Sequence, residues 1–161
     1  MRFRDRGEAG RRLAEALRHL APEARAGQLV VLGIPRGGVI VAYEVARALQ
    51  APLDVVLAHK LGAPDNPELA IGAVAEDGTL WIDPLAVAEL EVSPAYLEEE
   101  IRRQQEELRR RAERFRGARP PVPVAGRTAV VVDDGIATGA TMRVSLRSLR
   151  RQGARRLVVA A

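Results

Sequence analysis

The 161-residue chain contains no cysteine, which excludes disulfide bonds and thiol chemistry. Aromatic residues make up only 3% of it, so few rings are present on which nucleic-acid bases could stack. No apolar run reaches the length of a membrane span, and the N-terminal residues MRFRDRGE lack the apolar core of a signal peptide. Together with the length, these absences predict one cytoplasmic domain with no membrane partner.

Lysine is nearly absent as well, because Lys60 is the only one and the other basic residues are arginines. The net charge of +4 and the isoelectric point of about 10.5 raise the hypothesis of nucleic-acid binding. The arginines, however, are largely interleaved with glutamates along presumed helices, which is typical of a solvated, salt-bridged surface. A site for a multiply charged small anion explains the basic balance equally well.

The most informative stretch is TAVVVDDGIATGAT, residues 128–141. Its apolar, mostly β-branched start predicts a buried strand, which is followed by the adjacent carboxylates Asp133 and Asp134. Carboxylates accept hydrogen bonds from sugar hydroxyls, and a Gly/Thr loop at a helix N-terminus offers N–H groups to a phosphate. The stretch therefore predicts a sugar-phosphate site. The alternative is an ordinary strand-to-helix turn with two capping aspartates.

Residues 130–141 resemble, without a gap, the phosphoribosyl-pyrophosphate-binding signature of type I phosphoribosyltransferases, which has an apolar strand, paired acidic residues and a loop ending Thr-Gly-x-Thr. By element order the resemblance extends over residues 28–161. It implies an α/β fold with a mostly parallel central sheet and helices on both faces. The whole of residues 1–161 is then one phosphoribosyltransferase-like domain, with a helical insert at 83–120.

A second loop lies upstream, where the predicted strand 28–33 runs through GIPRGG into a helix over 39–50. Gly37 and Gly38 permit close backbone approach to a ligand, and Arg36 offers a bidentate fork for phosphate. In the resembled family the corresponding loop grips the pyrophosphate. A plain strand-to-helix turn is the alternative.

Lys60 follows a predicted buried strand over 53–59, where a parallel strand would deliver it to a ligand crevice. We therefore interpret it as a pyrophosphate contact, against the alternative of a surface charge. The loop 61–69 holds two prolines and a glycine. It corresponds in position to a loop of the resembled family that closes over the reaction centre and excludes water. A static connection is equally compatible with its sequence.

The remaining elements are predicted from periodicity and turn residues. An amphipathic helix over 5–20 is expected to pack on the sheet without a chemical role. A hairpin is expected from the strands 70–76 and 79–82 around Asp77-Gly78, followed by a long charged helix from Ser93-Pro94 to about residue 115. A helix to about residue 152 and a last strand over 155–161 complete the chain.

The resemblance implies transfer of ribose 5-phosphate from phosphoribosyl pyrophosphate to a nitrogen of a nucleobase-like acceptor, with release of pyrophosphate and with Mg2+ as cofactor. It assigns the acidic pair to the ribose hydroxyls and, indirectly, to the metal, the loop 135–141 to the 5′-phosphate, and Arg36, Gly37, Gly38 and Lys60 to pyrophosphate. The substrate-binding set is Asp133, Asp134, Gly135, Ile136, Ala137, Thr138, Gly139, Ala140, Thr141, Arg36, Gly37, Gly38 and Lys60. No general acid or base is assigned.

Two departures from the family pattern are visible. Hypoxanthine–guanine enzymes carry an acidic residue just before the Thr-Gly of this loop, whereas this chain has Ala137, as adenine and xanthine enzymes do. The chain also ends directly after its last strand, so the C-terminal hood of many members is missing. Either the N-terminal helix or the 83–120 insert supplies a hood, or the natural chain is longer.

Two other functions stay open at this stage. One is a non-catalytic regulator that senses phosphoribosyl pyrophosphate and binds nucleic acid through its basic surface. The other is a different sugar-phosphate enzyme on the same fold, because fold does not fix reaction. The thin apolar stripe of the long helix makes a homodimer a further hypothesis.

Overall fold

The structure, a computed structural model, describes residues 2–135 and 139–161. These residues form two compact units. The parallel-sheet unit is built from residues 2–56, 120–135 and 149–161, and the antiparallel-sheet unit from residues 57–119 and 139–148.

The parallel-sheet unit has four strands in the order β2-β1-β6-β7, all parallel. They are β1 Leu29–Gly33, β2 Leu53–Val55, β6 Thr128–Val132 and β7 Arg156–Ala160. The central strands β1 and β6 are buried along their whole length, which explains their continuous apolar sequences. Gly33 is in register with Val132, so the loops that follow β1 and β6 leave the sheet at the same level. The predicted parallel central sheet is confirmed.

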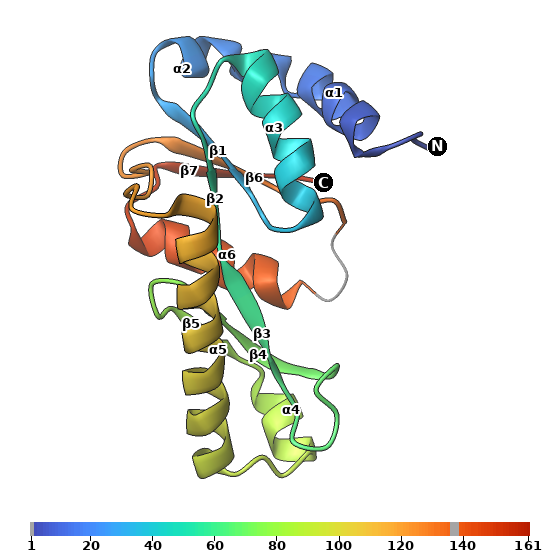
Figure 1. Cartoon of the computed structure of the whole chain (residues 1–161), viewed down its shortest axis with the longest axis vertical. Helices are drawn as coiled ribbons and strands as arrows, with labels where there is room; N and C mark the ends of the chain where they lie inside the picture. The colour runs from blue at the N-terminus through green and yellow to red at the C-terminus, as the bar shows by residue number, and fades with distance from the viewer. Residues whose placement is uncertain (1, 136–138) are drawn as a thin grey trace. The chain divides into compact units, whose positions relative to one another are not determined.

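The helices of this unit are α1 Arg6–Ala16, the 3-10 turn η1 Arg18–Leu20, α2 Ala21–Arg25 and α3 Gly37–Leu49. Helix α3 packs on β1, and α1 lies against α3 rather than on the sheet (Figure 1). The two helices approach so closely that a Cβ at Gly10 would lie 2.7 Å from the Cβ of Glu44. The predicted single helix over 5–20 is shorter in the structure, because α1 ends at Ala16 and is followed by η1 and α2.

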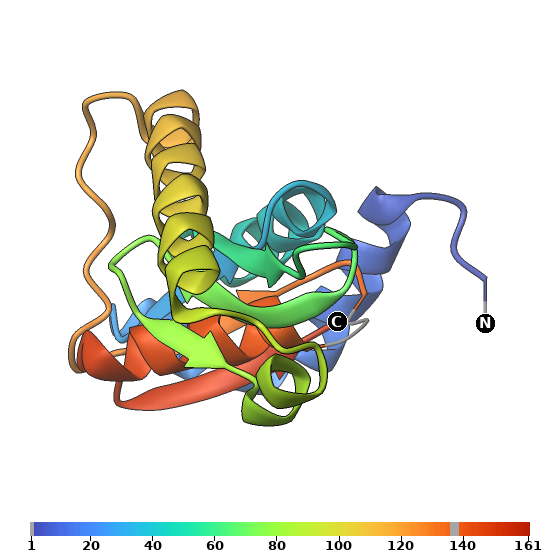
Figure 2. The same cartoon turned by 90° about the horizontal axis from the view of Figure 1, so that it is seen from below.

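The antiparallel-sheet unit has three strands in the order β3-β4-β5. They are β3 Ala58–Gly62, β4 Ala70–Ala75 and β5 Leu80–Ile82, and the predicted hairpin at Asp77-Gly78 joins the last two. Its helices are α4 Pro84–Glu89 and α5 Pro94–Arg116, and α5 lies against β3 and β4 (Figure 2). Helix α6 Ala140–Arg151 follows the signature loop, and its residues up to Ser148 belong to this unit.

The prediction of one strand over 53–59 is wrong. Residues 53–55 form β2 beside β1, whereas Ala58 begins β3, which pairs with β4 in the other sheet. Between them the Val56 N–H still donates to the Gly33 carbonyl oxygen, at 3.1 Å. The run Val55-Val56-Leu57 is buried throughout, so its composition does not reveal where the chain exchanges one sheet for the other.

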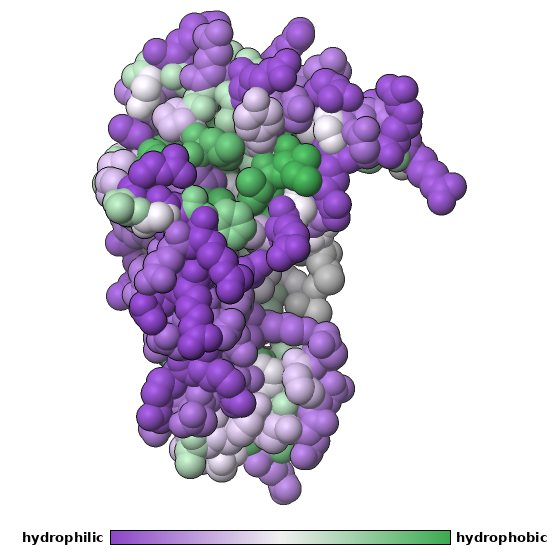
Figure 3. Space-filling view, viewed as in Figure 1, coloured by the Kyte–Doolittle hydropathy of each residue, from purple (hydrophilic) through white to green (hydrophobic). Residues whose placement is uncertain are grey.

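Helix α5 confirms the predicted long charged helix. The Ser93 hydroxyl caps it by accepting from the Tyr96 N–H at 3.1 Å, and Gly117 ends it with a φ of 59°. Its outer face is almost entirely hydrophilic in Figure 3 and carries arginine–glutamate ion pairs, mostly three residues apart. No helix among the described residues is long and apolar enough to cross a membrane.

Candidate functional site

The loops after β1 and β6 pack directly against each other within the parallel-sheet unit. The Ile34 N–H donates to the Val132 carbonyl oxygen at 2.9 Å, and a Cβ at Gly38 would lie 2.7 Å from that oxygen and 3.0 Å from the Asp133 Cα. Only glycine permits this approach of one backbone to the other. The structure thus brings the Arg36–Gly38 loop and the acidic pair to one edge of the sheet.

Gly37 makes room for a side chain of the protein itself. A Cβ at Gly37 would collide with Oδ2 of Asp134 and would lie 2.7 Å from Nε of Arg6. From the sequence, we assigned both glycines to close approach of a ligand. In the structure their space is used by Asp134 and by the Val132 backbone, so the glycines first allow the two loops to meet.

Asp134 carries an ion pair that sequence patterns did not indicate. Nε and Nη2 of Arg6 both donate to Asp134 Oδ2, at 3.2 and 3.1 Å. Arg6 is the first residue of α1, to which the sequence analysis gave no chemical role. The two residues are 128 positions apart, so no local spacing signals their contact.

Asp133 is the more enclosed carboxylate of the pair. Burial raises the pKa of Asp133, whereas the Asp134 N–H, which donates to its Oδ1 at 2.8 Å, acts in the opposite direction. Carboxyl groups with perturbed pKa values cluster at functional sites of proteins. The pair therefore combines a half-buried acid with an exposed, arginine-bound one.

A groove of about 1010 Å³ opens beside this pair in the same unit. Apolar side chains of α1, α3 and the N-terminal segment form much of its wall, and arginines of α1 stand among them. The lining residues are Phe3, Asp5, Arg6, Gly7, Ala9, Arg11, Arg12, Leu13, Ala16, Ile40, Val41, Asp133, Asp134 and Ala161. Phe3 and Ile40 are large apolar residues that are nearly half exposed, which is typical of a ligand-binding groove.

The donor set suits a metal ion only in part. Among residues 2–135 and 139–161 no group of three or more His, Cys, Asp or Glu side chains is placed to hold an ion. Mg2+ usually binds proteins through one or two carboxylates and takes its other ligands from water and substrate phosphates. Asp133 and Asp134 fit this limited role, so an ion would depend on oxygens of the substrate.

Six residues of the predicted loop 135–141 either belong to the antiparallel-sheet unit or lie outside the described residues. Ile136, Ala137 and Thr138 lie outside the described residues. Gly139 has a φ of 80°, which requires glycine, and its carbonyl oxygen accepts from the Arg143 N–H at 2.8 Å. Gly139, Ala140 and Thr141 lead into and begin α6 in the antiparallel-sheet unit, where Ala140 packs in the core with Ala73 and Val144.

Lys60 belongs to the same unit, and the premise of its prediction is wrong. It stands inside antiparallel β3, opposite Ala73, and not at the end of a parallel strand. Its Nζ donates to the Glu68 carbonyl oxygen at 3.0 Å and to Glu68 Oε2 at 3.2 Å. The loop between them is closed by the bond from the Ala63 N–H to the Leu69 carbonyl oxygen, at 2.9 Å. Lys60 thus ties down the two ends of the loop 61–69, and its pyrophosphate role stays a prediction.

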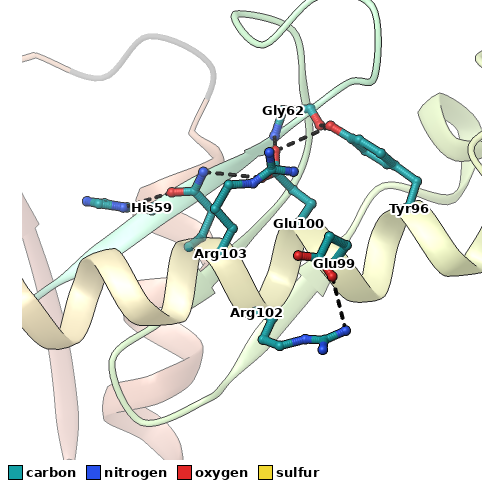
Figure 4. Close-up of polar contacts among 8 residues, drawn as sticks. His59, Gly62, Tyr96, Glu99, Glu100, Arg102 and Arg103 are labelled. Carbon is teal, nitrogen blue, oxygen red and sulfur yellow. Dashed lines mark hydrogen bonds and ion pairs between the residues drawn. The ribbon is translucent and has the colours of Figure 1, made fainter.

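A buried carboxylate, also not indicated by the sequence, anchors α5 to the end of β3. Figure 4 shows Glu100 pointing to Gly62, whose N–H donates to Glu100 Oε2 at 2.8 Å. The Tyr96 hydroxyl donates to the Gly62 carbonyl oxygen at 2.6 Å, and Arg103 pairs with Glu100 Oε1 at 3.1 Å. Glu100 is only 5% exposed, although it lies in a glutamate-rich stretch that is typical of a solvent-exposed helix.

Comparisons with known proteins show the family to which the chain belongs. The phosphoribosyl transferase domain model matches residues 5–161, and the chain therefore belongs to that family. It is 53% identical to TT1426 from Thermus thermophilus, whose crystal structure it matches with a TM-score of 0.77 over 99% of this chain and 74% of that one.

Among curated proteins, it is 51% identical over 158 residues to the putative phosphoribosyl transferase Rv0571c of Mycobacterium tuberculosis. That match includes 98% of this chain but 35% of the relative, so the chain spans about a third of its length. The purine phosphoribosyltransferase from Pyrococcus horikoshii matches with a TM-score of 0.51 at 18% identity, over 96% of this chain and 69% of that one, and shares the fold.

Proposed function

We propose that the chain is a phosphoribosyltransferase. It would transfer ribose 5-phosphate from phosphoribosyl pyrophosphate to a nitrogen of a nucleobase or related acceptor and release pyrophosphate. The observation that carries the proposal is the packing of the Arg36–Gly38 loop against the Asp133–Asp134 loop at one edge of a parallel sheet. Ligands of open α/β sheets bind at the carboxyl ends of the strands, where these loops lie.

The chemistry assigns a different task to each loop. Asp133 and Asp134 accept hydrogen bonds from the ribose hydroxyls, and their charge favours the positive ring that develops as the bond to pyrophosphate breaks. Arg36 is exposed and offers its guanidinium to the pyrophosphate. The N–H groups at the start of α6 suit the 5′-phosphate, because a helix N-terminus favours negative charge.

Mg2+, when bound, would neutralise the leaving pyrophosphate. Asp133 and Asp134 are the residues in this unit that would help to hold it, in agreement with the small number of carboxylates that Mg2+ needs from protein. Burial keeps the Asp133 pKa above its ordinary value, and a nearby cation would lower it.

The groove beside the pair is suited to the acceptor. Apolar side chains of α1 and α3 line the groove next to the two carboxylates. The apolar wall suits a flat nitrogen heterocycle, and the carboxylates suit the ribose beside it. Which base is accepted depends on residues that composition does not distinguish.

The regulator hypothesis gains no support from α5. Arg102, Arg109 and Arg110 each pair with a glutamate on the same helix, so these arginines alternate with negative charge and do not form a purely basic stripe for nucleic acid.

Pyrophosphate release tests the proposal. The wild-type chain is incubated with phosphoribosyl pyrophosphate, Mg2+ and a panel of purine and pyrimidine bases. We expect base-dependent release, reduced on the order of 100-fold in the Asp133→Asn/Asp134→Asn variant. Release that is the same in the variant would refute the site, and no release with any base from folded protein would refute the function.

A further inference from the structure

We infer that Arg6, from the N-terminal helix α1, is a positioning residue for Asp134 in the sugar-phosphate site. The inference rests on the proposed function, because it names a new residue that acts on the carboxylate assigned to ribose. It starts from the ion pair in which Arg6 Nε and Nη2 both donate to Asp134 Oδ2, at 3.2 and 3.1 Å.

Arg6 engages only one of the two oxygens of the Asp134 carboxylate. Both donors converge on Oδ2, and a carboxylate has about four acceptor positions on its two oxygens. Oδ1 can therefore accept from a ribose hydroxyl while Arg6 stays in place. The planar guanidinium presents both donors to Oδ2 in a fixed geometry, which a rotating ammonium would not do.

The arginine is itself held by a well-packed support. Asp5 caps α1 by accepting from the Glu8 N–H at 2.8 Å, and Gly10 allows α1 to pack closely on Glu44 of α3. The backbone of Arg6 is thereby fixed relative to α3, the helix that begins at Gly37. The absence of a side chain at Gly37 gives the guanidinium and Asp134 the room in which they meet.

The charge of Arg6 also has an electrostatic consequence. Asp133 and Asp134 are adjacent carboxylates, and two like charges at this distance repel each other. A guanidinium on Asp134 offsets that repulsion, while the neighbouring Asp133 side chain stays half-buried. Arg6 thus holds the Asp134 carboxylate in place at the wall of the groove before the sugar phosphate binds.

A double-mutant cycle tests this role by direct binding. Isothermal titration calorimetry measures the Kd of phosphoribosyl pyrophosphate with Mg2+ for wild type, Arg6→Met, Asp134→Asn and the double variant. We expect Arg6→Met to weaken binding about fivefold, the range of a partly exposed ion pair, and Arg6→Lys to lose less. In the Asp134→Asn background, Arg6→Met should cause no further loss, because the arginine acts through that carboxylate.

Arg18→Met is the matched control, since it removes one exposed positive charge from the same segment without touching Asp134. Its Kd should equal that of wild type, and circular dichroism confirms that each variant is folded. An equal loss from Arg6→Met in both backgrounds would overturn the inference, and so would tighter binding by Arg6→Met, which would make Arg6 a competitor of the ligand. If Arg6→Met does not fold, Arg6→Gln replaces it in the same cycle. A wild type that binds no phosphoribosyl pyrophosphate would instead refute the proposed function.

Discussion

Gly38 is the glycine of the two site-forming loops at which an added methyl group would meet backbone atoms. It lies in the first turn of α3, and a Cβ there would stand 2.7 Å from the Val132 carbonyl oxygen and 3.0 Å from the Asp133 Cα. Both neighbours are backbone atoms of the site-forming loop, so they cannot rotate away as a flexible side chain would. Gly38→Ala must therefore push the loop after β6 away from the loop after β1.

The size of the effect follows from two opposing contributions. Overpacking of a well-packed interior costs about 1–3 kcal/mol. Replacing glycine with alanine inside a helix stabilises by up to about 1 kcal/mol. We expect Gly38→Ala to lower the free energy of unfolding by about 1–2 kcal/mol, measured by urea denaturation followed by circular dichroism.

Gly7→Ala is the matched control, since Gly7 also lies in the first turn of a helix. Its Cβ would meet the side-chain ends of Arg11 and Asp5, each at 3.2 Å, and that of Glu44 at 4.0 Å. Because these neighbours are side-chain ends and not backbone, this variant should lose less stability than Gly38→Ala. A Gly38→Ala protein as stable as Gly7→Ala would refute the claim that the two loops are held in backbone contact.

Two further predictions concern the antiparallel-sheet unit. Glu100→Ala should lower the free energy of unfolding by about 1–3 kcal/mol, because it leaves the buried Gly62 N–H without its acceptor. Glu99→Ala, the control, removes an exposed partner of Arg102 and should lower it by less than about 0.5 kcal/mol in the same urea assay. Burial lowers the pKa of His59, and the charge of Arg111 adds to this, so the folded state disfavours the protonated ring. The contribution of His59 to the free energy of unfolding is therefore fully present above its unfolded pKa of about 6.5 and is lost as the pH falls through the lower folded pKa. His59→Gln should make the free energy of unfolding fall less steeply between about pH 7.5 and 5.

Patterns local in the sequence predicted much of the fold. The buried strands at 29–33 and 128–132, the hairpin at Asp77-Gly78 and the capped helix after Ser93 each follow from a few neighbouring residues. The exchange of sheets after Val55 could not be predicted, because a buried apolar run fits a parallel or an antiparallel partner equally well.

The candidate site shows the same limit. Paired aspartates after a valine run and Gly-Gly after a strand indicate where ligand-binding loops begin, and the structure packs these two loops together. The contacts of Arg6 with Asp134 and of Glu100 with Gly62 join residues far apart in the chain, and charged residues in helices usually face water. No periodicity marks such long-range contacts. Lys60 was predicted to follow a parallel strand, but it lies inside antiparallel β3.

Equilibrium binding of phosphoribosyl pyrophosphate is the most direct test of the account, since it depends on the site and not on the identity of the acceptor. Calorimetry with Mg2+ should show binding to the wild-type chain and a loss of at least about tenfold in the Asp133→Asn/Asp134→Asn variant. Glu89→Gln/Glu91→Gln, which converts two exposed carboxylates to amides in and just after α4, should bind as wild type does. Equal affinity for all three proteins would contradict the claim that the acidic pair after β6 holds the sugar.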